Sequence, residues 1–147
     1  MHVKVLGDFV AAGQILVVDD EAPVRQTLKA ALESAGYSVE QAGSIEAATP
    51  LLQTKAFDLV LTDLIMPGAS GLALLDYARQ NHRLIPVVMV TGVSDISVAL
   101  ESIRLGAYDY LLKPFQREQL LAVVSRAWKN TGWRWRTSPT RLSWRRW

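Results

Sequence analysis

The sequence predicts an α/β protein in which a five-stranded parallel sheet is doubly wound, with five helices covering its two faces. Five short apolar runs alternate along the chain with five longer segments of helical periodicity. The apolar runs are nearly continuous, as is typical of parallel strands that are buried on both faces. At 147 residues the chain is long enough to bury such a core. We therefore expect one principal domain.

The first half of the chain is expected to contain three strands and two helices. In order, these are a strand at 14–18, a helix at 23–35, a strand at 37–42, a helix that includes 45–52 and a strand at 57–62. Pro23 suits the first turn of the first helix, and Gly36 stops that helix. Ser44 is a suitable N-cap for the second helix. Pro50 has no amide hydrogen, so we expect it to kink or shorten this helix.

The second half is expected to contain three helices and two strands. In order, these are a helix from 70 to 80, a strand at 87–90, a helix from 94 to 105, a strand at 109–112 and a helix at 117–128. The segment 66–68 is typical of a turn, and Ser70 is a suitable cap for the helix that follows it. Pro86 precedes the next strand, and Gly106 closes the helix after that strand.

The charge of the chain is unevenly distributed. All 14 acidic residues precede Lys129, whereas six of the 16 basic residues lie at 129–147. The part of the chain before Lys129 is therefore net acidic, although the whole chain has a formal charge of +2. The basic character belongs to the tail and does not by itself predict nucleic-acid binding by the domain.

Composition also excludes several kinds of site. The chain has no cysteine and only two histidines, which rules out disulfides, thiolate chemistry and a histidine-rich metal site. No apolar run approaches the roughly 20 residues of a membrane-spanning helix. Asp8 stands where a secretion signal would be apolar, so we expect a cytoplasmic location.

Polar side chains gather at the carboxyl ends of the expected strands. Asp19 and Asp20 end the first strand, Asp63 the third and Thr91 the fourth, and Lys113 follows the fifth. Ligands of open parallel sheets bind at this edge. If the first and third strands are neighbours, three carboxylates converge, and their mutual repulsion favours a hard divalent cation such as Mg²⁺. One aspartate after a strand is usually a cap or turn residue, but this set at four strand ends favours a functional site.

Four segments around these residues resemble the response-regulator receiver domain of two-component signalling, with the resemblance covering about 14–128. The segments are Ile15–Glu21, Leu61–Gly68, Val90–Gly92 and Ala107–Phe115. Their occurrence in this order and at these spacings is a specific match. The resemblance implies a flavodoxin-like sheet with the strand order 2-1-3-4-5.

The resemblance also implies a role for each acidic residue. Asp63 is expected to be the nucleophile that takes a phosphoryl group from a phosphohistidine on a sensor histidine kinase. Asp20, Asp63 and the backbone carbonyl of Ile65 are expected to bind Mg²⁺ directly, and Asp19 through water. This agrees with elementary chemistry, because a carboxylate that attacks an anionic phosphoryl group needs the negative charge neutralised.

The remaining site residues follow from the same resemblance. The Lys113 ammonium would add positive charge, and the Thr91 hydroxyl would donate to a phosphoryl oxygen. Thr91 and Tyr110 would form the switch, with Tyr110 turning inward when Thr91 moves; on physics alone, Tyr110 is more often a partly exposed core residue. The bond from Lys113 to Pro114 is implied to be cis.

At the level of the whole chain, the resemblance implies a phosphoacceptor signalling domain that catalyses only its own phosphorylation and dephosphorylation. Its partners would be a sensor histidine kinase or phosphotransfer protein, and a downstream effector or dimer mate. The domain is expected at 14–128, between an extension at 1–13 and a basic tail at 129–147 that is rich in tryptophan and arginine. We interpret this tail as a disordered extension or a linker remnant.

Two other functions remain open. A Mg²⁺-dependent phosphohydrolase of the haloacid-dehalogenase type would carry a second aspartate two residues after its nucleophile, where this chain has Ile65. A nucleic-acid binder would use the alternating arginine and tryptophan residues of 129–147 for stacking. Loss of binding on deletion of this tail would favour that alternative, but nothing in the tail specifies a fold.

Overall fold

The computed structural model describes residues 13–66, 69–81 and 85–130. Within these ranges, strands and helices alternate as the sequence predicts. The elements are β1 (Gln14–Val18), α1 (Ala22–Ser34), β2 (Ser38–Ala42), α2 (Ile45–Thr54), β3 (Leu59–Asp63), α3 (Gly71–Asn81), β6 (Val87–Gly92), α4 (Ile96–Arg104), β7 (Asp109–Lys113) and α5 (Arg117–Asn130). Two short strands, β4 (Ile65–Met66) and β5 (Ala69–Ser70), form a separate hairpin between β3 and α3.

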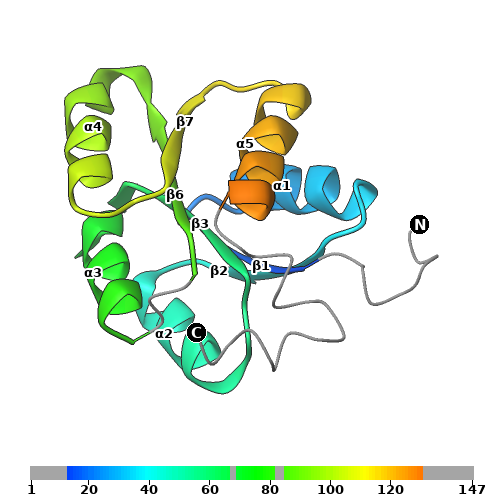
Figure 1. Cartoon of the computed structure of the whole chain (residues 1–147), viewed down its shortest axis with the longest axis horizontal. Coiled ribbons are helices and arrows are strands. Elements are labelled where there is room, and N and C mark those ends of the chain that lie inside the picture. The colour runs from blue at the N-terminus through cyan, green and yellow to red at the C-terminus, as the bar shows by residue number, and fades with distance from the viewer. Residues whose placement is uncertain (1–12, 67–68, 82–84, 131–147) are drawn as a thin grey trace.

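The five long strands form one parallel sheet in the order β2-β1-β3-β6-β7 (Figure 1). Counted along the chain, this is the order 2-1-3-4-5, so the predicted fold class and strand order are confirmed. The register places the ends of the strands together: Val18 of β1 pairs with both Ala42 and Thr62. Gly92 of β6 pairs with Lys113 of β7 at the same edge of the sheet.

Helices cover both faces of the sheet (Figure 1). α1 and α5 pack on one face, where Leu28, Leu32 and Leu120 join a buried cluster with Ile15 and Val17 of β1. α2, α3 and α4 pack on the other face. There, the strand residues whose side chains point away from α1 and α5 contribute to a second buried cluster. The three inner strands β1, β3 and β6 are thus buried on both sides, which explains their nearly continuous apolar runs, whereas the edge strands β2 and β7 are only partly buried.

The helix ends show the expected local chemistry. Ser44 caps α2 by accepting a hydrogen bond from the amide of Ala47 at 3.1 Å. Ser70 Oγ accepts from the amide of Leu72, also at 3.1 Å, at the start of α3. Gly36 follows α1 with a φ of 102°, a backbone region that glycine adopts without strain.

Several elements of the first half differ in detail from the expectation. β2 begins at Ser38 rather than Tyr37, because the amide of Tyr37 bonds the carbonyl of Leu32 at the end of α1, 3.1 Å away. β3 begins at Leu59, and Phe57 lies buried before the paired segment. α2 continues past Pro50 to Thr54, because proline removes only a single backbone donor and the amide of Lys55 again bonds the carbonyl of Leu51. Pro50 therefore does not end the helix, and the expected kink remains a prediction.

Further differences lie in the second half. Met66, which was expected in the turn at 66–68, is the last residue of the hairpin strand β4 and pairs with Ala69 of β5, and 67–68 lie outside the described residues. α4 begins at Ile96 rather than at Ser94, after a 3-10 turn over Val93–Asp95, and ends at Arg104. The side chain of Trp128, which was expected on the apolar side of the last helix, is also outside the described part of the structure.

None of the helices in the described ranges has both the length and the apolar character that crossing a bilayer requires.

Candidate functional site

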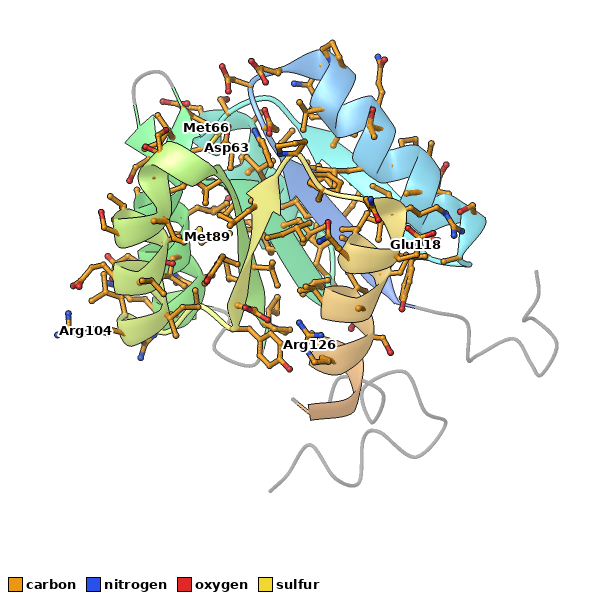
Figure 2. The ribbon with its side chains drawn as sticks, turned by 90° about the horizontal axis from the view of Figure 1, so that it is seen from above. Asp63, Met66, Met89, Arg104, Glu118 and Arg126 are labelled. Atoms are coloured by element: carbon orange, nitrogen blue, oxygen red, sulfur yellow. The ribbon has the colours of Figure 1, made fainter. Side chains whose placement is uncertain are left out.

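The candidate site lies at the carboxyl ends of the central strands. Asp19 directly follows β1, and its amide bonds the carbonyl of Ala42 at 3.1 Å, which continues the pairing of β1 with β2 by one residue. Asp63 is the last residue of β3, and Lys113 is the last residue of β7. Figure 2 shows Asp63 at one end of the sheet, with Arg126 toward the opposite end.

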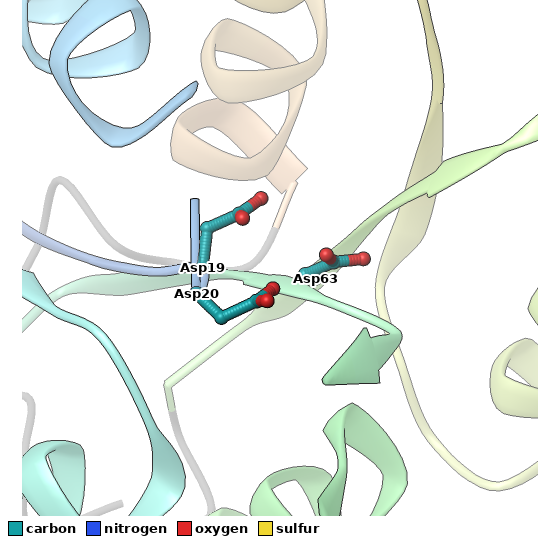
Figure 3. Close-up of side chains that lie close together, drawn as sticks. All are labelled: Asp19, Asp20 and Asp63. Atoms are coloured by element: carbon teal, nitrogen blue, oxygen red, sulfur yellow. The ribbon is translucent and has the colours of Figure 1, made fainter. Parts of the chain in front are cut away.

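Three carboxylates converge here, as the sequence predicts. One carboxylate oxygen from each of Asp19, Asp20 and Asp63 lies within 4.8 Å of the other two. Asp19 is 1% exposed and Asp63 is 8% exposed, whereas Asp20 is exposed to solvent. Figure 3 shows the Asp20 side chain extending toward Asp63 from the neighbouring chain segment.

Lys113 supplies positive charge between two of these carboxylates. Its Nζ donates to Asp19 Oδ2 at 3.2 Å and to Asp63 Oδ2 at 3.4 Å. Burial acts to lower the pKa of Lys113, but Asp19 and Asp63 together raise this pKa above its ordinary value. The ammonium is therefore charged at neutral pH, and the predicted placement of Lys113 beside Asp63 is found in the structure.

The charge balance around Asp63 remains unfavourable to its ionised form. Burial, followed by repulsion from Asp19, raises the pKa of Asp63. The Lys113 ammonium and the amide of Ile65, which donates to Asp63 Oδ1 at 3.3 Å, offset only part of this increase. Three crowded carboxylates with one ammonium form a donor set that fits a hard divalent cation with oxygen ligands.

Thr91 contributes a second unusual group. It lies in β6, one residue beyond Val90, the pairing partner of Asp63. Among the described residues the Thr91 hydroxyl is fully buried and has no hydrogen-bond partner. A buried hydroxyl is normally satisfied, because leaving it unpaired costs about 1–3 kcal/mol. Thr91 therefore keeps a donor free at the carboxyl end of the sheet.

The remaining predicted site residues, Ile65 and Tyr110, do not contact the carboxylates through their side chains in any recorded hydrogen bond among the described residues. The side chain of Ile65 is 52% exposed, in β4 at the pocket that Asp20, Asp63 and Lys113 also line. Tyr110 is half-buried and packs against the core on the face of α2, α3 and α4. Its inward movement remains a prediction. The bond between Lys113 and Pro114 is cis, as the resemblance implies.

Sequence reasoning missed Gly71, the first residue of α3. A Cβ atom at this position would lie 2.4 Å from the carbonyl oxygen of Asp63 and 3.1 Å from Cα of Leu64. The amide of Gly71 also donates to the carbonyl of Leu64 at 2.8 Å. Gly71 thus allows α3 to begin directly against the backbone that carries Asp63. The sequence signal was a glycine, a poor helix former, immediately after the Ser70 cap.

Replacement of Gly71 with alanine is expected to destabilise the protein by about 2 kcal/mol, because the added methyl group overpacks a backbone contact. Helix propensity alone would predict the opposite sign. Urea midpoints would measure the change. Gly92→Ala is the matched control: its Cβ would meet nothing closer than Asp95 Oδ2 at 3.9 Å. Equal midpoints for Gly71→Ala and wild type would contradict the close approach.

A doubly wound parallel sheet with three aspartates at the carboxyl ends of its strands is the arrangement of a known class of signalling domains. Residues 15–125 match the family model of the response regulator receiver domain, and the chain belongs to this family. It is 40% identical over 111 residues to the DNA-binding transcriptional regulator NtrC of Klebsiella pneumoniae, covering 76% of this chain and 24% of that protein. It is 36% identical to the transcriptional regulatory protein FixJ of Bradyrhizobium diazoefficiens, covering 78% of this chain and 56% of that protein.

Solved structures agree with this assignment. The receiver domain of NtrX from Brucella abortus is 37% identical, with a TM-score of 0.77, and the match covers 79% of this chain and 98% of that one. The chain therefore spans a whole receiver domain but only a minor part of NtrC. It is a receiver domain of a response regulator, a signalling domain of the phosphoacceptor kind, which confirms the resemblance found in the sequence.

Proposed function

We propose that Asp63 of this receiver accepts a phosphoryl group from a sensor histidine kinase or phosphotransfer protein. The observation that carries the proposal is the position of Asp63: a largely buried carboxylate, in contact with Lys113, at the carboxyl end of the central strand. We assign the receiver to 14–128, the same bounds that the sequence indicates.

In the proposed reaction, a carboxylate oxygen of Asp63 forms a bond to phosphorus while the bond from phosphorus to the imidazole nitrogen of phosphohistidine breaks. The imidazole leaves with the electron pair and takes up a proton. Lys113 already lies within reach of an Asp63 oxygen and supplies positive charge where the phosphoryl oxygens arrive. The unpartnered hydroxyl of Thr91 is available to donate to one of those oxygens.

The three carboxylates also fit a Mg²⁺ site. We assign Asp19, Asp20, Asp63 and the backbone carbonyl of Ile65 as the groups that hold the ion. A bound Mg²⁺ supplies positive charge that lowers the repulsion between the carboxylates and an incoming phosphoryl group. The raised pKa of Asp63 supports this part of the proposal, since Lys113 alone does not balance the buried charge.

The phosphorylated form is proposed to act by shifting a conformational equilibrium. Thr91 and Tyr110 lie on the neighbouring strands β6 and β7, and the surface formed by α4, β7 and α5 would change with them. A downstream effector or a second copy of the chain would recognise that surface. Hydrolysis of the aspartyl phosphate, catalysed by the receiver itself, would end the signal.

Neither alternative function gains support from the described residues. The position at which a dehalogenase-type phosphohydrolase carries its second aspartate is occupied by the exposed Ile65. Binding of nucleic acid by the tail remains a prediction, because 131–147 lie outside the described residues.

Treatment with acetyl phosphate and Mg²⁺ tests the proposal. We expect intact-mass spectrometry to show one added phosphoryl group, peptide mapping to place it on Asp63, and EDTA to prevent its addition. Decay of the group after removal of acetyl phosphate measures the hydrolysis. A group attached to another residue, or addition that is indifferent to EDTA, would contradict the assignment.

A further inference from the structure

Arg25 joins three parts of the chain beside the acidic residues. It lies in the first turns of α1, and its Nη1 donates to the backbone carbonyl oxygen of Asp19 at 2.6 Å. Its Nε donates to Oε1 of Gln41 in β2 at 3.2 Å. Both contacts go to neutral oxygen atoms rather than to a carboxylate. Arg25 therefore connects α1, the turn after β1, and the neighbouring strand.

The carbonyl that Arg25 holds belongs to the peptide unit between Asp19 and Asp20. Several contacts fix Asp19 itself. Its amide donates to the carbonyl of Ala42, and its carboxylate accepts hydrogen bonds from the amide of Glu21 at 2.9 Å and from the Lys113 ammonium. Within the described part of the chain, the structure records no hydrogen bond to the Asp20 carboxylate. The orientation of Asp20 therefore depends on the peptide unit that precedes it.

We infer that Arg25 is a positioning residue that fixes the Asp19–Asp20 peptide unit and thereby sets the affinity of the site for a divalent cation. The inference rests on the proposed Mg²⁺ site. A charged donor to a carbonyl is a strong hydrogen bond, and the planar guanidinium can direct two donors to two different segments at once. Preorganising the exposed Asp20 in this way removes an ordering cost from cation binding.

The surroundings of Arg25 agree with a defined position for its guanidinium. A Cβ atom at Gly43 would lie 3.2 Å from Arg25 Nη1, so the absence of a side chain there leaves room for the group. Lysine could supply the charge at position 25, but a single ammonium on a flexible stem cannot reproduce the planar pair of directed bonds.

Calorimetric titration of the full chain with Mg²⁺ tests the inference without any phosphoryl transfer. We expect Arg25→Ala to weaken Mg²⁺ binding about tenfold, as is usual when a group that orients a metal ligand is lost. Arg25→Lys should recover only a small part of the loss. Lys29→Ala is the matched control, because Lys29 is another cation of α1 and pairs with Glu33 at 2.7 Å. Its Mg²⁺ affinity should stay within about twofold of wild type.

A second readout separates positioning from a general loss of structure. At saturating Mg²⁺, acetyl phosphate should label Arg25→Ala to the same extent as wild type. Only the Mg²⁺ concentration needed for half-maximal labelling should increase. If Arg25→Ala does not fold, Gln41→Ala carries the test, and we expect it to weaken Mg²⁺ binding by about threefold.

The outcomes are distinct. If wild type binds Mg²⁺ and the Arg25 and Gln41 variants bind it with unchanged affinity, this inference is overturned and the proposed function still stands. Equal weakening by Lys29→Ala, or full recovery by Arg25→Lys, also overturns it, because charge alone would then explain the effect. Wild type that does not bind Mg²⁺ overturns both the inference and the proposed metal site.

Discussion

Replacement of Asp63 with asparagine is expected to abolish labelling by acetyl phosphate and, at the same time, to stabilise the protein in the absence of metal. The amide of asparagine has no nucleophilic carboxylate oxygen, so no aspartyl phosphate can form. Burial and repulsion from Asp19 raise the pKa of Asp63, which means that the folded state disfavours the ionised carboxylate. Removing this charge should increase the free energy of unfolding by about 1 kcal/mol at neutral pH.

The stability change should also depend on pH in a defined direction. Because folding raises the pKa of Asp63, the favourable contribution of its protonated form is fully present below the ordinary carboxyl pKa of about 4. That contribution is lost as the pH rises through the raised folded value. The advantage of Asp63→Asn over wild type should therefore grow from acid to neutral pH and vanish at low pH.

Intact-mass spectrometry and urea midpoints in EDTA measure the two effects. Asp76→Asn is the control, because Asp76 is an exposed aspartate of α3 whose carboxylate contacts Gln80 at 3.2 Å. This variant should be labelled like wild type and should have nearly the same midpoint. Labelling of Asp63→Asn equal to that of wild type would refute the phosphoacceptor assignment, and a lower midpoint in EDTA would refute the charge argument.

Local sequence patterns predicted the elements of this fold, but not all of their connections. The apolar segment Gln14–Val18 identified β1, and Ser44 and Gly36 marked helix ends correctly. The order of the strands came from the family resemblance. Val18 pairs with both Ala42 and Thr62, which are far from it in the sequence, and a local sequence pattern cannot predict such pairing.

The missed features share a physical cause. A two-residue strand such as Ile65–Met66 is too short to show any periodicity, so the hairpin was expected to be a turn. The contact between Gly71 and the Asp63 carbonyl exists only once α3 packs against the end of β3. Arg25 reaches Gln41 only because β2 lies beside β1.

The candidate site was easier to predict than these supporting contacts. Parallel strands bring their carboxyl ends to one edge, so aspartates at the ends of β1 and β3 had to approach each other once the strands were neighbours. The unpartnered state of the Thr91 hydroxyl could not be anticipated, because it depends on every group that surrounds Thr91 in the folded chain.

Replacement of Lys113 with methionine is expected to destabilise the metal-free protein by about 2 kcal/mol at neutral pH. Removing one partner of a buried ion pair typically costs about 3–5 kcal/mol, because the other charge is left buried and uncompensated. The smaller value applies here because 24% of the Lys113 side chain is exposed. Methionine keeps the length and the apolar stem of lysine, so the change isolates the loss of charge.

The pH dependence and a second substitution distinguish this loss of charge from a packing defect. Because Asp19 and Asp63 raise the pKa of Lys113, its contribution is fully present at neutral pH and is lost only as the pH rises through the folded pKa. Without the ammonium, the pKa of Asp63 should rise further, so the stability deficit of Lys113→Met should shrink as the pH falls and Asp63 becomes protonated. Combining Lys113→Met with Asp63→Asn should likewise recover part of the stability, since one of the uncompensated charges is then absent.

Urea midpoints of the single and double variants in EDTA give the coupling between the two side chains. Lys55→Met serves as the matched control, because Lys55 pairs with Glu40 at 2.6 Å but its side chain is 49% exposed. An exposed pair of this kind contributes little, so Lys55→Met should change stability by less than about 1 kcal/mol at any pH. If Lys113→Met loses no more stability than Lys55→Met, or loses the same amount at acid and neutral pH, then the Lys113 ammonium does not balance the buried carboxylates. In that case protonation of Asp63, whose pKa is raised by burial and by Asp19, would account for the charge balance at this edge of the sheet in place of the Lys113 ammonium.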